Sequence, residues 1–405
     1  MGRLRQEADV VVVNQYFPPD TSATALRLFE VCERLTSDWR VVVLCGTPSY
    51  NVDSAGSMLR HETERLRIVR IPSCRFSRKT RLGRGLNYAT YLLGVTGALA
   101  FVHTKRCIVA FTDPPIVGLA ALLWARLKRK PLIQVVQDLH PEAAVASGVL
   151  RGGLTAGTLH WITNVYLRRA NAVVVIGERM KEYLIRARGV AEERITIIPN
   201  WSEIDDSVCT VDVGALDPSA FRVLYAGNLG LSQGLDVIID CAKRLRLYRD
   251  IQFIVVGDGV ERERFIGAIS EQGLTNVAVL GKRLPKTEFA RFIKECHVGL
   301  VLMKDGLNSA LVPSKVYTIM AAGIPFLSAG GKGSETETLA LRHGAGIALR
   351  HDAEEMAAAI LQLRDHPEDR RRMGENGRSA AVREYGREAG LGKYAALVKA
   401  SVLPL

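Results

Sequence analysis

One lysine at the start of a predicted helix is the residue whose position most directly suggests chemistry. Lys315 follows Pro313 and Ser314, and Ser314 can cap the helix that these residues open. A cation at a helix N-terminus is unfavourable, because the aligned peptide dipoles already give that end a partial positive charge. The position becomes favourable when an anion binds between the ammonium group and the helix N–H groups. Lys315 and Ser314 are therefore candidates for binding a phosphate or diphosphate group.

Two glycine-rich turns offer a second set of groups that suit a phosphate. Residues 224–236 read as a strand, a turn with Gly227, Asn228 and Gln233, and the start of a helix. Residues 253–259 repeat this order and end with Asp258 between two glycines. Backbone N–H groups at the start of a helix bind anions. Asp258 is a candidate for contacting the same ligand, or a turn residue that stabilises its own backbone.

The first half of the chain carries polar residues at a comparable position. Asp138 follows a predicted strand over 132–136, at the edge of a parallel sheet where open α/β folds bind ligands. It is a candidate catalytic residue that orients a hydroxyl group of a substrate, and its alternative role is to cap the following helix. His140 and Glu142 are either contacts to that substrate or polar groups of that cap region.

The loop after the first predicted strand lacks the motifs that bind nucleotide cofactors. Residues 14–24 contain no glycine, so the Gly-x-Gly-x-x-Gly fingerprint of dinucleotide-binding domains is missing. Asp20 and Thr21 open a helix here and are candidates for contacting an anionic acceptor, whereas Thr21 or Ser22 is equally suited to be its N-cap. The sequence also has no Gly-x-x-x-x-Gly-Lys-[Ser/Thr] loop. We predict no cofactor.

Buried strands that alternate with helices must position all of these residues. Near-continuous apolar runs separated by amphipathic segments are typical of parallel sheets covered on both faces. The sequence predicts an α/β protein with two Rossmann-like domains facing across a cleft. We place the first domain at 1–200, a linker at 201–220, the second domain at 221–375, and helices at 376–405 that could pack back on the first domain. The predicted strands are 9–14, 41–45, 67–71, 107–111, 132–136, 172–176, 195–198, 221–226, 251–256, 277–280, 298–302 and 324–328.

The length and charge of the chain fit this division. The 405 residues exceed what a single core usually supports. The formal net charge of +12 lies wholly in the first 200 residues, around 75–84, 105–106, 126–130 and 168–169. Such a surface attracts nucleic acid, anionic lipid or phosphorylated small molecules, unless its cations are ordinary solvated helix ends. Aromatic residues make up only 6% and do not cluster among these cations, which argues against nucleic acid.

The cysteines and the N-terminus indicate a reducing compartment. Seven cysteines show no Cys-x-x-Cys pair and no histidine at ligand spacing, which argues against a disulfide framework and a zinc site. The apolar run at 10–13 is too short for the core of a signal peptide. We therefore expect a cytoplasmic protein.

One apolar segment, Leu82 to Val102, approaches the length that spans a bilayer. Its four glycines and the absence of clean flanks disfavour spanning. We predict a helix of the first domain that faces the core, with a helix seated on the membrane interface as the alternative.

Taken together and in order over about residues 10–350, these motifs resemble the family 4 retaining glycosyltransferases, in the branch that builds bacterial surface polysaccharides on lipid carriers. The resemblance implies a GT-B fold, a nucleotide-sugar held mainly by the second domain, an acceptor held mainly by the first, and no need for a divalent metal. The motifs that carry it are Pro18-Pro19-Asp20, residues 113–119, Gln137 to Glu142, Ile198-Pro199-Asn200, Gly227 to Gly230, Gly257-Asp258-Gly259 and Pro313-Ser314-Lys315.

Three positions depart from the usual pattern of that family. Most members carry two glutamates eight positions apart, where this chain has Ala310 and Thr318. The usual histidine before the motif aspartate is Gln137. The resemblance still places Thr318 in the donor site, but without a carboxylate to bind the ribose.

The residues that usually clamp the diphosphate also differ. The Arg and Lys of other members are Asn228 and Gln233 here, as in the polysaccharide branch. The diphosphate charge must then be met elsewhere, and our candidates are Lys315 first and Arg283 second. Stabilising the leaving diphosphate by N–H groups and cations would carry most of the catalysis.

The resemblance leads to a specific expectation of function. We expect a retaining, metal-independent hexosyltransferase that moves a sugar from a nucleoside-diphosphate sugar, a UDP-sugar, to a hydroxyl of a glycan or lipid-linked acceptor in cell-surface polysaccharide biosynthesis. The first domain could attach peripherally to the anionic inner face of the cell membrane. The alternatives are a sugar-nucleotide epimerase of the same fold and a non-catalytic protein that binds nucleotide-sugars.

Overall fold

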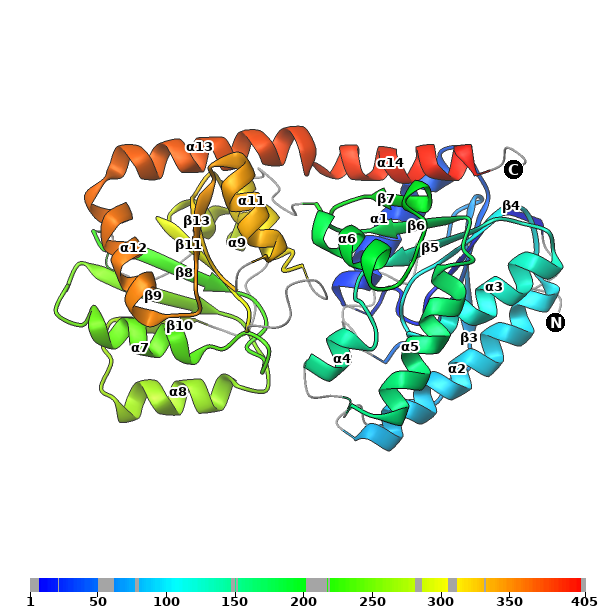
Figure 1. Cartoon of the computed structure of the whole chain (residues 1–405), viewed down its shortest axis with the longest axis horizontal. Coiled ribbons are helices and arrows are strands. Elements are labelled where there is room, and N and C mark those ends of the chain that lie inside the picture. The colour runs from blue at the N-terminus through cyan, green and yellow to red at the C-terminus, as the bar shows by residue number, and fades with distance from the viewer. Residues whose placement is uncertain are drawn as a thin grey trace. The chain divides into compact units, whose positions relative to one another are not determined.

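The computed structural model divides the chain into two compact units (Figure 1). Unit 1 contains Met1–Pro199 and Gly390–Leu405, and unit 2 contains Asn200–Ala389. The division lies beside the predicted end of the first domain at residue 200. Most of the predicted linker over 201–220 lies outside the described residues. The structure describes residues 7–20, 22–49, 62–76, 80–146, 150, 152–201, 217, 219–280, 286–304, 312–330 and 333–401.

Unit 1 is built on a parallel sheet in which every described neighbour pair runs in the same direction. Its strand order is β3-β2-β1-β4-β5-β6-β7. The central strands are buried along most of their length, as expected of a sheet with helices on both faces. The strands are β1 (Glu7–Val13), β2 (Val41–Gly46), β3 (Leu66–Ile71), β4 (His103–Ala110), β5 (Leu132–Val136), β6 (Ala172–Val175) and β7 (Ile195–Ile197).

Short polar residues fix where several helices of unit 1 begin. The hydroxyl of Ser22 accepts a hydrogen bond from the Ala25 N–H at 3.1 Å and caps α1, while Thr80 caps α2 through the Gly83 N–H at 3.2 Å. The C-terminal part of α14, from Gly390, belongs to unit 1. The helices are α1 (Ala23–Thr36), α2 (Arg81–Phe101), α3 (Val117–Leu127), α4 (Glu142–Ala146), α5 (Leu154–Leu167), α6 (Glu178–Arg186), a 3-10 turn (Glu192–Arg194) and α14 (Arg387–Ala400).

Unit 2 repeats this architecture with a parallel sheet ordered β10-β9-β8-β11-β12-β13. Alternate residues of β9 enter two separate cores, because Phe253 and Val255 pack in one and Ile254 and Val256 in the other. The strands are β8 (Phe221–Ala226), β9 (Ile251–Val256), β10 (Val277–Leu280), β11 (Val298–Leu302), β12 (Phe326–Ala329) and β13 (Gly346–Leu349). The helices are α7 (Asp236–Arg244), α8 (Arg262–Glu271), α9 (Lys286–Lys294), α10 (Lys315–Ala322), α11 (Glu335–His343), α12 (Ala353–Asp365) and α13 (Pro367–Glu384).

These two sheets confirm the predicted α/β fold with two Rossmann-like domains. Besides shifts of one or two residues at the ends of several strands, two details differ from the expectation. The edge strand β13 was not predicted, since it is short, begins with a glycine and has no run of β-branched residues. Strand β4 begins at His103 rather than at 107, because its first residues are polar and partly exposed.

The apolar segment at 82–102 forms α2, which has one buried and one exposed apolar side. Tyr91, Val95 and Leu99 are buried in unit 1. Leu82 and Leu93 are each 75% exposed. None of the helices in the described ranges is long and apolar enough to cross a membrane.

Candidate functional site

Lys315 is the first residue of α10, and its charged end is enclosed by protein. Its Nζ is buried and has no hydrogen-bond partner among the described residues. The same atom lies 4.1 Å from the centre of the Tyr225 ring, whose π face attracts a cation. Burial lowers the pKa of Lys315 to about 7. The structure thus holds a buried ammonium group over an aromatic face, with no anion beside it in the part of the chain that the structure describes.

The neighbouring turn leaves room for this ammonium group. A β-carbon on Gly227 would lie 2.7 Å from the Lys315 Nζ, closer than real contacts allow. Gly227 also has a φ of +148°, which disfavours residues with a side chain. The Tyr225 hydroxyl donates a hydrogen bond to the Asn228 carbonyl at 2.8 Å and fixes the turn beyond the strand. The φ of this turn therefore favours glycine at 227, and any side chain there would also displace the end of Lys315.

Hydrogen bonds join the two glycine-rich turns of unit 2. The Leu229 N–H donates to the Asp258 carbonyl at 2.9 Å, and the Glu261 N–H donates to the Leu229 carbonyl at 2.9 Å. The Gln233 side chain accepts from the Gly230 N–H at 3.1 Å, so it orders the turn from within. The Asp258 carboxylate accepts from the Gly259 N–H at 3.0 Å and is exposed.

These groups gather at one edge of the second sheet. Strand β8 lies between β9 and β11 and runs parallel to both, so the turns after β8 and β9 lie at the carboxyl ends of adjacent strands. Ligands of open α/β sheets bind at this edge. Ser314 precedes α10 but its side chain makes no capping hydrogen bond, unlike the predicted cap. Thr318, one turn after Lys315, is partly exposed. Arg283 and Ala310 lie outside the described residues.

In unit 1, Asp138 lies just beyond the carboxyl end of β5. Burial, and to a smaller extent the nearby Asp113 carboxylate, raise the pKa of this carboxyl to about 7. Asp113 follows β4, which pairs with β5, so the two acids come from adjacent strand ends. The Gln137 N–H donates to the Thr112 hydroxyl at 3.4 Å and links the same two loops.

Glu142 is held in a structural ion pair. Arg188 is fully buried, and its guanidinium lies 2.5 Å from the Glu142 carboxylate, whose other oxygen accepts from the Tyr183 hydroxyl at 2.6 Å. Burial opposes ionisation of Glu142, but the Tyr183 hydrogen bond and the Arg188 charge outweigh it and lower its pKa. The carboxylate therefore fixes the start of α4 from inside unit 1.

His140 lies on the same loop and presents a polar atom without a partner. Arg188 and Thr163 donate to its carbonyl at 2.7 and 3.2 Å, which fixes the backbone. Its Nδ1 is buried and has no hydrogen-bond partner within the described part of the chain. Burial lowers the pKa of His140 to about 4, so the ring is neutral near pH 7. A neutral imidazole fixed at this edge is suited to hydrogen-bond a hydroxyl group.

The loop after β1 is organised around Asp20. Its buried carboxylate accepts from the Ser49 N–H at 2.7 Å and from the Phe17 N–H at 3.4 Å. Ser22, one of the two predicted caps, caps α1, while Thr21 lies outside the described residues. The carboxylate of Asp20 thus joins two segments of its own unit.

Sequence reasoning missed Tyr225 and Arg188. Tyr225 reads as an ordinary strand residue, and its contact with Lys315 arises only when α10 packs beside β8. Arg188 reads as an exposed cation at a helix end. Arg188 is buried in the structure, and its partners Glu142 and the His140 carbonyl lie 46 and 48 positions away, so no local sequence pattern indicates the contact.

Two family models cover most of the chain. The model described as glycosyl transferase 4-like domain matches residues 21–201, and the one described as glycosyl transferases group 1 matches residues 212–380. The two matches coincide with the two sheets of the structure.

Curated relatives share part of the sequence. WcaI of Escherichia coli (strain K12), named as a colanic acid biosynthesis glycosyl transferase, is 30% identical over 50% of this chain and 51% of its own length. WbjE of Pseudomonas aeruginosa, named as a glycosyltransferase, is 26% identical over 75% of this chain and 74% of its own. The chain thus aligns with about half the length of WcaI.

Solved structures share the fold over nearly the whole chain. Sucrose-phosphate synthase from Thermosynechococcus elongatus superposes with a TM-score of 0.77 at 16% identity, covering 98% of this chain and 99% of that one. Anabaena HepE in complex with UDP gives a TM-score of 0.73 at 15% identity, covering 97% and 100%. At these identities the likeness concerns the fold alone.

Proposed function

Because the chain belongs to the family 4 glycosyltransferases of the GT-B fold, we propose that it transfers a sugar from a UDP-sugar to a hydroxyl of a glycan or lipid-linked acceptor in cell-surface polysaccharide biosynthesis. The observation that carries this proposal is the buried Nζ of Lys315, which lies beside the turn at Gly227 and has no hydrogen-bond partner within the described ranges. A diphosphate would supply an anion for this ammonium group. The UDP bound by HepE and the colanic acid role in the name of WcaI support the nucleotide and the pathway class.

In the proposed reaction the bond between the anomeric carbon and the diphosphate oxygen breaks, and its electron pair leaves with UDP. Lys315 and the N–H groups at the start of α10 stabilise the negative charge that develops there. The acceptor hydroxyl attacks the same face of the sugar, so the configuration is retained. Its proton passes to the departing phosphate oxygen. No step in this scheme uses a metal ion.

The carboxyl edge of unit 1 is proposed to bind the acceptor. Asp138 orients a hydroxyl of the sugar or acceptor, and the neutral ring of His140 offers a second hydrogen bond. Asp20 and Glu142 act indirectly, since their carboxylates already hold the loops that carry the site. The role of Asp138 is therefore separable from theirs by mutation.

We also propose that unit 1 attaches to an anionic membrane surface. The exposed side of α2 presents Leu82, Leu93 and Phe101, and α3, which packs against α2, presents Leu123 and Leu127. Apolar side chains of this kind bury in the interfacial region of a bilayer, and neighbouring cations are attracted to anionic lipids. Such attachment would bring the enzyme to a lipid-linked acceptor.

A panel of nucleotide-sugars tests the proposal. The full chain is screened for thermal stabilisation, since a ligand of the folded state raises apparent stability. Donors that bind are incubated with candidate acceptors, with and without EDTA, and the anomeric configuration of the product is read by NMR. Release of UDP with a retained anomeric centre and no loss in EDTA is expected. An inverted product, or activity that EDTA abolishes and Mg²⁺ restores, would refute the corresponding part of the proposal.

A further inference from the structure

A basic cavity opens at the edge of the first sheet that lies opposite Asp138. It has a volume of about 710 Å³ and is lined at the amino ends of β4, β5, β6 and β7 and at the ends of α3, α5 and α14. Leu132, the first residue of β5, is part of its wall, whereas Asp138 follows the last residue of that strand. At a rise of about 3.3 Å per residue, six residues separate the two by roughly 20 Å. The cavity is therefore no part of the proposed sugar-transfer site.

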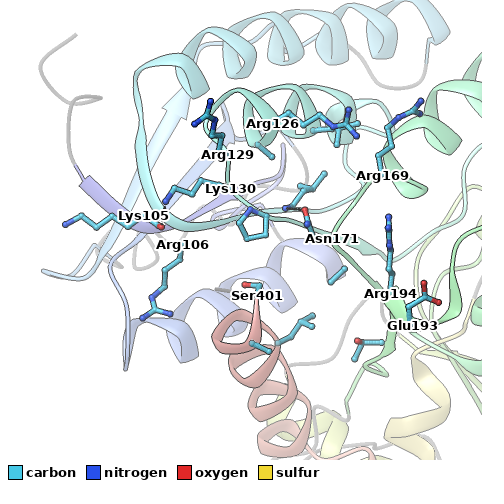
Figure 2. Close-up of a pocket in the computed structure, with 18 residues that line it drawn as sticks. Lys105, Arg106, Arg126, Arg129, Lys130, Arg169, Asn171, Glu193, Arg194 and Ser401 are labelled. Atoms are coloured by element: carbon cyan, nitrogen blue, oxygen red, sulfur yellow. Dashed lines mark hydrogen bonds between the residues drawn. The ribbon is translucent and has the colours of Figure 1, made fainter. Parts of the chain in front are cut away.

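Its wall is strongly positive. Figure 2 shows Arg126, Arg129 and Arg169 on one side of the cavity and Ser401 on the other. Lys105, Arg106, Lys130 and Arg194 complete a set of seven cations, against one lining carboxylate, Glu193.

Little of this charge is neutralised. Lys105 pairs with Glu7 at 2.5 Å. Lys130 and Arg194 donate to backbone carbonyls of Lys105 and Arg168, which satisfies N–H groups without cancelling charge. No carboxylate pairs with Arg126, Arg129, Lys130, Arg169 or Arg194 among the residues that the structure describes. Cations gathered at one cavity repel one another, and an anion bound between them relieves that repulsion.

Arg129 has a backbone conformation that is unfavourable for a residue with a side chain. It follows α3 with a φ of +53°, the left-handed conformation that side chains disfavour, and Lys130 N–H closes the turn on the Ala125 carbonyl at 2.8 Å. Every other left-handed position recorded in the described ranges is a glycine, as at the ends of α10 and α11. Helices normally end with glycine in this position. An arginine here is explained if its guanidinium has a function in the cavity.

A neutral donor completes the cavity. The side-chain oxygen of Asn171 accepts from the Leu132 N–H at 3.0 Å, which leaves the amide N–H groups as its free end. Asn171 lines the cavity between the cations. Arginine forks and amide donors are the groups that bind phosphate oxygens in proteins.

We propose that this cavity is a second anion site, which binds a phosphate group through Arg126, Arg129 and Asn171. The phosphate could belong to a lipid headgroup or to a soluble phosphorylated molecule. Leu123 and Leu127 are exposed on the same helix as Arg126, and exposed apolar side chains on that helix would favour a lipid headgroup. The chemistry of recognition is the same in either case.

The test compares the full chain with Arg126→Gln, Arg129→Gly and a control, Arg186→Gln, which removes an exposed cation of α6 that does not line the cavity. In the first arm, inorganic pyrophosphate is titrated calorimetrically in saturating UDP, which occupies the donor site if that exists. In the second, the proteins are sedimented with phosphatidylcholine vesicles with and without phosphatidic acid. We expect both cavity variants to bind at least about tenfold more weakly in one or both arms, and the control to match the parent.

Arg129→Gly separates binding from folding. Removal of the side chain relieves the left-handed strain, so the variant is expected to unfold about 2–4 °C higher than the parent while losing affinity. A loss confined to vesicles identifies a lipid phosphate, and a loss confined to pyrophosphate identifies a soluble ligand. Parent-like binding by both cavity variants in both arms would overturn the proposal. Because the comparison is between the parent and variants of this cavity, the test of the cavity remains valid even if UDP does not bind to the proposed donor site.

Discussion

The ammonium group of Lys315 lies 4.1 Å from the centre of the Tyr225 ring and has no anionic partner among the described residues. If a diphosphate binds here, Lys315→Met should weaken UDP binding about 10–150-fold, which corresponds to the roughly 1.5–3 kcal/mol of a charged hydrogen bond. Isothermal titration measures the change. Lys294→Met, the same exchange at an exposed position of α9, should leave the affinity unchanged.

Gly227→Ala tests the same contact from the other side. The added β-carbon would lie 2.7 Å from the Lys315 Nζ and must displace it. We expect UDP binding to weaken without loss of the ammonium charge. If both Gly227→Ala and Lys315→Met bind UDP as tightly as the parent, the diphosphate does not bind at the start of α10.

The pH dependence of turnover should be bell-shaped around neutrality. The pKa of Asp138 is raised to about 7, so its carboxylate is lost as the pH falls below that value. The pKa of Lys315 is lowered to about 7, so its charge is lost as the pH rises above it. Both groups are in the required state only near pH 7, and kcat/KM reports them in the free enzyme. A profile that is flat from pH 5.5 to 8.5 would contradict these roles.

Asp138→Asn should separate catalysis from stability. We expect turnover to fall about 100-fold or more, with UDP binding unchanged, because Asp138 is on unit 1. The raised pKa means that ionised Asp138 destabilises the folded state, fully above pH 7 and not at all below the ordinary value of 3.8. The variant should therefore unfold at a higher temperature than the parent at pH 8 and at the same temperature at pH 3.5. Full activity in Asp138→Asn would leave it a structural residue.

Arg188 should prove essential to the fold of unit 1. Arg188→Met leaves Glu142 and the His140 carbonyl without their donor, and we expect a loss of about 3–5 kcal/mol in the free energy of unfolding. Urea denaturation measures it. If the ion pair is the cause, Glu142→Gln should cost less in the Arg188→Met background than in the parent. Equal costs in both backgrounds would assign the loss to the carbonyl contacts.

Membrane attachment should depend on the exposed leucines of unit 1. Leu93→Gln combined with Leu123→Gln removes apolar area that is 75% and 50% exposed, so co-sedimentation with anionic vesicles should decrease. Leu341→Gln, at a 72% exposed leucine of unit 2, is the matched control. Equal sedimentation of all three proteins, or none by the parent at low salt, would exclude this surface.

The sheets could be predicted from sequence because most strands are short, continuous runs of apolar residues. Val10 to Val13, Val41 to Val43 and residues 253–256 are apolar runs too short for helices. Strand β13 was not predicted because it lies at the edge of the sheet and has no run of β-branched residues. Among the candidate site residues, Lys315 and Asp138 could be selected from their place after a strand or before a helix.

What could not be predicted was which polar groups are already engaged. Glu142 and Asp20 look as available in the sequence as Asp138, yet they hold Arg188 and the Ser49 N–H. These partners are distant in the chain and meet only when the sheet forms. The same holds for the basic cavity, whose cations come from separate strands and helices and were visible in sequence only as excess charge.

Unit 1 is discontinuous, and this has a consequence for the order in which the nascent protein folds. Leu391, Tyr394 and Val398 of α14 are buried, and the segment from Gly390 belongs to unit 1. Domains fold on the ribosome as their residues emerge. Unit 2 has all of its residues once Ala389 has been translated, whereas the first domain to be synthesised lacks a helix until after the second is complete. The segment that completes the core of unit 1 is therefore synthesised only after the whole of unit 2.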